Sequence, residues 1–144
     1  MSIDILIALP EDAREICFDV EGDLFDYTEV DGLAPILLFL LLGVLEKNPS
    51  RIGDLAKEFE ILHGNSISSV HLIPDKLTKR LSQLNSESIK TVAKRWHKDK
   101  RVQAMEVRLA PLKSALAKLC KLSKVAVEHE QPLLYRYSSQ NWQK

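Results

Sequence analysis

The stretch LAPILLFLLLGVL, residues 33–45, runs for thirteen residues without a charged side chain. As a helix it would be only about 20 Å long, because an α-helix rises 1.5 Å per residue, and this is too short to cross a hydrocarbon core of about 30 Å. A helix that is apolar on every side belongs in a protein interior. We therefore predict a central buried helix over residues 33–47, with Pro35 in its first turn, where a missing N–H is tolerated.

Apolar residues at helical spacing predict further helices around this one, over residues 50–62, 74–84, 86–96 and 102–127. Pro111 lies inside the last of these, so we expect the helix to kink or restart there. The resulting fold class is mostly α, a compact helical bundle of about five helices.

The two ends of the chain have a different character from the middle. Residues 3–7 and 133–137 are rich in residues that favour strands, and the two segments could pair as a small two-stranded β element that joins the N- and C-termini. A length of 144 residues fits one domain, so we expect residues 1–144 to form a single helical domain. Residues 1–32 then form an acidic arm that packs on or beside it.

The cysteines and the N-terminus bear on the cellular compartment. Cys17 and Cys120 belong to no C-x-x-C pair, so they are predicted to be reduced, buried thiols. The opening residues MSIDILIALP lack the basic segment of a secretory signal. We therefore expect a cytoplasmic protein without a membrane-spanning segment.

Charge is distributed very unevenly along a chain whose formal net charge is zero. Residues 1–60 contain 14 acidic and 4 basic side chains, whereas residues 61–144 contain 6 acidic and 16 basic ones. Asymmetry of this kind carries information about partners rather than about the fold.

The acidic charge is densest over residues 11–31, where nine carboxylates accompany Arg14 alone. In one interpretation this segment lies over the protein's own basic helices, and the two charges screen each other. In the other it is a flap, bearing Phe18 among its aromatic residues, that binds a basic surface of another protein. The candidate partner-binding residues are Asp19, Glu21, Asp23, Phe25, Asp26 and Tyr27.

The same segment resembles a metal-binding loop only in part. Asp19, Glu21 and Asp23 have the 1, 3, 5 spacing of an EF-hand. Leu24 stands where that loop needs glycine, and Val30 where it needs a bidentate glutamate. We therefore predict no metal site and no cofactor.

A basic run after residue 89 suggests nucleic-acid binding as the alternative function. Its candidate residues, which would neutralise phosphates, are Lys90, Lys94, Arg95, Lys98, Lys100 and Arg101. An exposed Trp96 between them could stack on a base, but its helical spacing with Ile89 and Val92 favours a place in the core.

Catalytic motifs are missing from the sequence. The four histidines lie in separate elements, and the chain contains neither a metalloprotease H-E-x-x-H nor a phosphate-binding P-loop, so no catalytic residue is predicted. An enzyme of unknown class stays a third hypothesis. We predict a small cytoplasmic interaction or regulatory protein that binds another protein, with nucleic acid the less favoured partner and a homo-oligomer left open.

Overall fold

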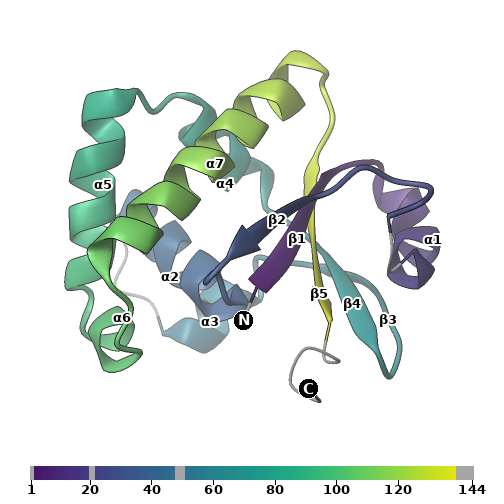
Figure 1. Cartoon of the computed structure of the whole chain (residues 1–144), viewed down its shortest axis with the longest axis horizontal. Helices are drawn as coiled ribbons and strands as arrows, with labels where there is room; N and C mark the ends of the chain where they lie inside the picture. Colours follow the sequence, from purple (N-terminus) through teal and green to yellow (C-terminus); the bar gives the residue numbers. More distant parts are fainter. Residues whose placement is uncertain (1, 20–21, 48–50, 139–144) are drawn as a thin grey trace.

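The computed structural model describes residues 2–19, 22–47 and 51–138, and these residues build a five-stranded antiparallel sheet with helices on both faces (Figure 1). The strand order is β2-β1-β5-β4-β3. The strands are β1 (Ser2–Ile7), β2 (Thr28–Asp31), β3 (Ile61–Gly64), β4 (Ser68–Leu72) and β5 (Leu133–Ser138).

The predicted helical bundle is therefore wrong, and the fold is a mixed α/β one. The terminal segments do pair, with Ile5 opposite Tyr135, but as two neighbours inside a larger sheet rather than as a two-stranded element. On the other edge of β5, β4 pairs antiparallel with β5 and forms a hairpin with β3. β5, the last strand in the sequence, thus joins the β1–β2 pair to the β3–β4 pair.

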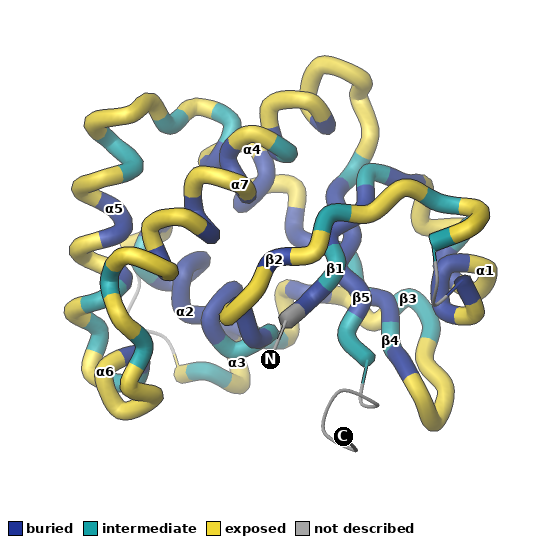
Figure 2. Tube along the Cα trace, viewed as in Figure 1, coloured by how far each residue is buried: buried dark blue, intermediate teal, exposed yellow. Residues whose placement is uncertain are grey.

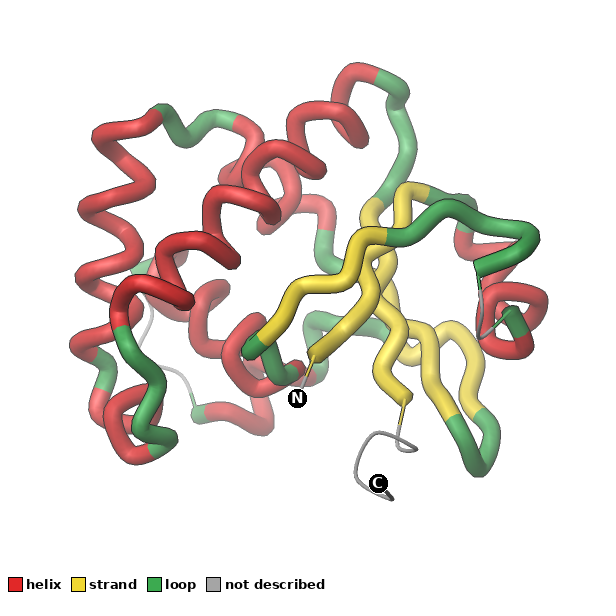
Figure 3. The backbone as a smooth tube through the Cα atoms, viewed as in Figure 1, coloured by secondary structure: helices red, strands yellow, loops and turns green. Residues whose placement is uncertain are grey.

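Seven α-helices belong to the described residues, shown in red in Figure 3 together with a short 3-10 turn over Pro10–Asp12. They are α1 (Ala13–Phe18), α2 (Pro35–Glu46), α3 (Ile52–Ala56), α4 (Asp75–Ser82), α5 (Ser86–Lys98), α6 (Lys100–Ala104) and α7 (Leu109–Glu128).

Two local expectations had different outcomes. The helix predicted over residues 50–62 is wrong, because α3 ends at Ala56 and residues 61–64 form strand β3. Phe59 and Leu62 sit at helical spacing, yet Phe59 is buried in the main core and Leu62 packs against the opposite face of the sheet. At Pro111 the helical pattern does restart, because α7 begins at Leu109 with the proline in its first turn.

The main core lies between one face of the sheet and helices α2 to α7. α2 occupies its centre, with seven of its twelve residues buried (Figure 2). Trp96 of α5 is completely buried, as its spacing predicted, and its indole Nε1 donates a hydrogen bond to the Leu37 carbonyl of α2 at 3.1 Å. In the part of the chain that the structure describes, no helix is long and apolar enough to cross a membrane.

The opposite face of the sheet carries a second, smaller core under α1. Ile16 and Cys17 of α1 pack there against Leu6, Val70 and Leu134, which project from three neighbouring strands. Successive residues of a strand point to opposite faces, so the central strands supply apolar residues to both cores.

Arg136 of β5 projects into this second core and is only 1% exposed. Its Nε and Nη2 donate to the Asp4 carboxylate at 3.0 and 2.9 Å, and its Nη1 donates to the carbonyls of Ile16 and Asp19 at 2.8 and 2.7 Å. The planar guanidinium can serve these acceptors together because its donors are arranged as a rigid fork. Arg136 therefore ties β5, β1 and the end of α1 to one another.

Replacing Arg136 by Met should destabilise the fold by about 3–5 kcal/mol, because the substitution leaves the Asp4 carboxylate and two carbonyls without their buried donor. Urea unfolding followed by circular dichroism measures the loss. Lys113→Met, an exposed position on α7, is the matched control and should change stability by less than about 0.5 kcal/mol. Equal unfolding midpoints for the two variants would contradict the role given to Arg136.

A column of aromatic rings, formed by His71, Tyr135 and Phe59, lies on the main-core face of the sheet near β4. The His71 imidazole stacks on the Tyr135 ring, with ring centroids 4.5 Å apart and planes within 1° of parallel. The Phe59 ring lies on Tyr135 edge-on, with ring centroids 6.3 Å apart. Burial lowers the pKa of His71 below its usual value, although a hydrogen bond with the backbone of Phe59 raises it in part. The folded state therefore favours the neutral imidazole.

This preference predicts that stability falls as the pH is lowered through the ordinary histidine range. The unfolded chain takes up a proton near pH 6.5 whereas folded His71 does so only at lower pH, so the loss begins below about pH 6.5 and levels off below the folded pKa. Urea melts at pH 7.5, 6.5, 5.5 and 5.0 should show a shallower pH dependence for His71→Phe, which keeps a ring on Tyr135 and removes the proton. Parallel curves for wild type and variant would disprove the assignment.

Candidate functional site

The two charged regions lie at opposite ends of the molecule along its long axis. α1 and the loop that follows it are at one end, and α5 and α6 are at the other, with the sheet and the main core between them (Figure 1). The part of the acidic segment in α1 and the residues after it therefore does not lie over the basic helix α5, whereas β2, at the end of the segment, lies against α7. Each end can be considered as a separate candidate site.

At the acidic end, Asp19 organises the loop after α1. Its side chain is buried, and its two carboxylate oxygens accept hydrogen bonds from the backbone N–H groups of Asp23, Leu24 and Phe25 at 2.9, 3.0 and 2.9 Å. Desolvation raises the pKa of Asp19, but these three bonds and the charge of Arg136 outweigh it, so the net shift is downward. Asp19 is therefore ionised at neutral pH and fixes the backbone N–H groups of residues 23–25.

Gly22 and Tyr27 close this loop. Gly22 has a φ of +74°, and a Cβ at this position would collide with the Tyr27 ring, so both the backbone and the packing require glycine. The same ring lies over the Arg136 guanidinium, whose Cζ is 5.2 Å from the ring centroid, in a cation–π contact.

Two large apolar side chains stand exposed on this acidic surface. Phe18 is 63% and Leu24 is 76% exposed, and both line a shallow pocket of about 460 Å³. The other residues that line the pocket are Arg14, Glu15, Asp19 and Asp23. Side chains of this size are normally buried, so two of them at one pocket mark a surface suited to a partner.

The structure brings only part of the predicted partner-binding set to this surface. Asp23 and Asp26 are exposed, but Phe25 packs against the second core. Glu21 lies outside the described residues. Sequence analysis missed Leu24, because a single leucine within an acidic run gives no signal that it is exposed.

At the basic end, Lys90, Lys94 and Lys98 stand four residues apart on the exposed side of α5. Residues at this spacing share one helix face, so the three ammonium groups form a stripe about 12 Å long. Lys100 of α6 is also exposed. Trp96 is buried, as its helical spacing predicted, and cannot stack on a base.

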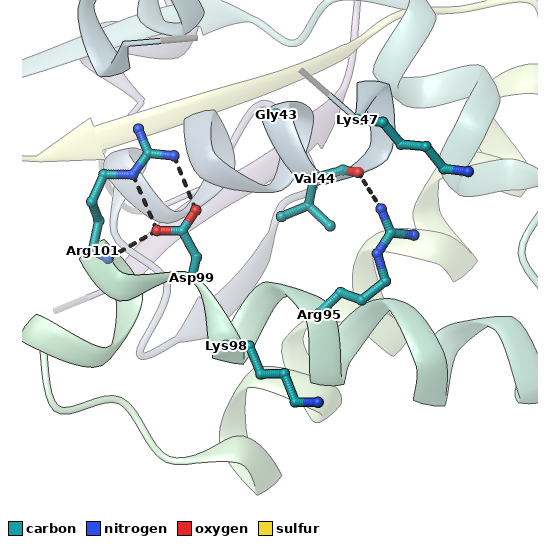
Figure 4. Close-up of a pocket in the computed structure, with 7 residues that line it drawn as sticks. All are labelled: Gly43, Val44, Lys47, Arg95, Lys98, Asp99 and Arg101. Carbon is teal, nitrogen blue, oxygen red and sulfur yellow. Dashed lines mark hydrogen bonds and ion pairs between the residues drawn. The ribbon is translucent and has the colours of Figure 1, made fainter. Parts of the chain in front are cut away.

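A hollow of about 450 Å³ opens where the end of α2 meets α5 and α6 (Figure 4). It is lined by Gly43, Val44, Lys47, Arg95, Lys98, Asp99 and Arg101. Arg95 Nη2 donates to the Val44 carbonyl at 2.7 Å, and Arg80 of α4 donates in the same way to the Leu45 carbonyl at 2.6 Å. These two arginines cap the C-terminus of α2, together with the N–H of Lys47, which donates to the Val44 carbonyl at 3.2 Å.

Asp99 is the single carboxylate at this hollow. It accepts from the backbone N–H of Arg101 at 2.8 Å and from Arg101 Nε and Nη2 at 3.1 and 2.9 Å. The side-chain hydrogen bond from Arg101 is the main reason that the pKa of Asp99 is lowered. Lys47 was not among the predicted basic residues, because it is far from the others in the sequence.

The groups suited to catalysis do not come together. His97 Nε2 lies 3.1 Å from the Val107 carbonyl, and His71 belongs to the aromatic column. Burial raises the pKa of Cys120 to about 11, which is the opposite of what a nucleophilic thiol needs. Within residues 2–19, 22–47 and 51–138, no group of three or more histidine, cysteine or acidic side chains could hold a metal ion.

Comparison with known proteins adds no family to this description. No family model matches the sequence, and neither the curated proteins nor the solved structures contain a match. The function therefore has to be argued from the two charged ends themselves.

Proposed function

We propose that the protein binds another protein through its acidic end, and that the partner supplies a basic segment with an apolar side chain. One observation carries this proposal: Phe18 and Leu24 are both exposed at a single pocket whose rim includes Glu15 and Asp23. The apolar side chains would supply the binding free energy, and the surrounding carboxylates would select and steer a basic partner.

Preorganisation of the loop supports a role in binding. The backbone of residues 23–25 is held by Asp19, and Tyr27 is held against Arg136, so the backbone that carries Leu24 is fixed on both sides. A surface that is already ordered pays less entropy when a partner binds. The two cysteines are free and buried, which is consistent with action in the reducing cytoplasm.

A selection experiment tests the chemistry of the partner without naming it. Random heptapeptides displayed on phage are selected against the full chain. We expect the recovered peptides to combine two or more lysines or arginines with an aliphatic or aromatic residue. Recovery of acidic or uncharged peptides would contradict the proposal.

The pocket is then tested with the best recovered peptide, synthesised with a fluorophore and titrated by anisotropy. Phe18→Ser with Leu24→Ser should weaken binding about tenfold or more, because central apolar contacts dominate interface energies. The control, Met105→Ser with Val127→Ser, removes two exposed apolar side chains outside the acidic end and should leave affinity within about twofold. Raising the salt concentration should slow association mainly, because exposed charges steer encounter. Equal losses for the two double variants would place the binding surface elsewhere.

A further inference from the structure

The hollow at the basic end has a charge imbalance that packing does not explain. Four cationic side chains line it, and one carboxylate, Asp99, faces them. Arg101 of α6 forms an ion pair with the Asp99 carboxylate at 2.9 Å, so the negative charge of Asp99 is already balanced by Arg101. The hollow keeps a net charge of +3 from Lys47, Arg95 and Lys98.

The three cations Lys47, Arg95 and Lys98 form no ion pair with another described residue. The Arg95 guanidinium donates to the neutral Val44 carbonyl. This contact uses one of the five N–H donors of the guanidinium and leaves its positive charge uncompensated. Like charges gathered in a concave surface repel one another and raise the local concentration of anions.

A structural role accounts for Arg95 but not for the lysines. Capping α2 requires donors to its last carbonyls, and Arg95 and Arg80 provide them. Lys47 adopts a left-handed conformation with φ of 53°, where glycine or asparagine is favoured, so backbone geometry does not select a lysine there. Lys98 is exposed and its charge also has no assigned partner.

We propose that this hollow binds the diphosphate group of a small ligand, either free or esterified. A diphosphate carries several negative charges and many acceptor oxygens, which suits two ammonium groups and the remaining donors of one guanidinium. A singly charged carboxylate would gain less from three cations. A volume of about 450 Å³ exceeds that of one phosphate and leaves room for the second, or for an esterified group.

Calorimetry with inorganic pyrophosphate tests the site directly. Wild type should show saturable binding with one site per chain. Lys47→Asn with Lys98→Gln should weaken it about tenfold or more, and Lys47→Asn keeps the backbone in place because asparagine tolerates the left-handed conformation. The matched control, Lys90→Gln with Lys94→Gln, removes the same charge from exposed positions of α5 that do not line the hollow and should change affinity less than about twofold. Should the first pair of substitutions prove unstable in a thermal melt, Lys98→Glu alone provides the same comparison.

Two further probes separate the sources of the phosphates. Tighter binding of ADP than of pyrophosphate identifies an esterified ligand, whereas equal affinity means that the diphosphate alone is recognised, and both results support the site. A fluorescent single-stranded oligonucleotide tests the competing idea that the lysine stripe follows a nucleic-acid backbone. The proposal would be overturned if the wild type showed no saturable binding of pyrophosphate. It would also be overturned if the wild type bound the oligonucleotide and both double variants weakened that binding equally.

Discussion

The interaction on which most of the molecule depends is the burial of Arg136 in the central strand. β5 is the last strand in the sequence, yet it lies between β1 and β4, so the sheet is complete only when the two ends of the chain meet. Arg136 gives this closure its specificity, because its donors are satisfied only when Asp4 of β1 and the end of α1 are in place. A buried guanidinium without these acceptors would be strongly unfavourable, so the arrangement disfavours shifted strand registers.

The same arginine determines how the acidic charge is used. It holds the Asp19 carbonyl, and the Asp19 carboxylate in turn holds the N–H groups of residues 23–25. Part of the negative charge therefore fixes the backbone after α1, and two exposed carboxylates, Glu15 and Asp23, line the pocket with Phe18 and Leu24. Folding and the proposed binding surface consequently share one network, in which Asp19 positions the loop and its exposed neighbours are available to a partner.

The sequence predicted the helices better than the sheet, for reasons that particular residues make clear. α2 was recognisable because an uncharged run of thirteen residues is typical of a buried helix, and α5 because Ile89, Val92 and Trp96 have helical spacing. The structure adds a capping box of Asn85 and Ser88 at the start of α5. β2, β3 and β4 have only four or five residues each, and they gain stability from neighbours distant in the sequence. β5 was predicted as a strand, but nothing in its sequence showed that it pairs with β4 as well as with β1. It buries residues on both faces, including an arginine. The convergence of Lys47 with Arg95 and Lys98 depends on the packing of α2 against α5, which no local pattern encodes.

The separation of the two charged ends explains how a chain with zero net charge can present two strong local fields. At physiological ionic strength the field of an exposed charge decays over about 8 Å, so groups across the whole core are screened from each other. The acidic loop is fixed by contacts to β1 and β5, and the basic hollow by contacts among α2, α4, α5 and α6. No residue belongs to both sets. The residues named for one end therefore share no side chain with those named for the other, so the two proposed binding surfaces should act independently of each other.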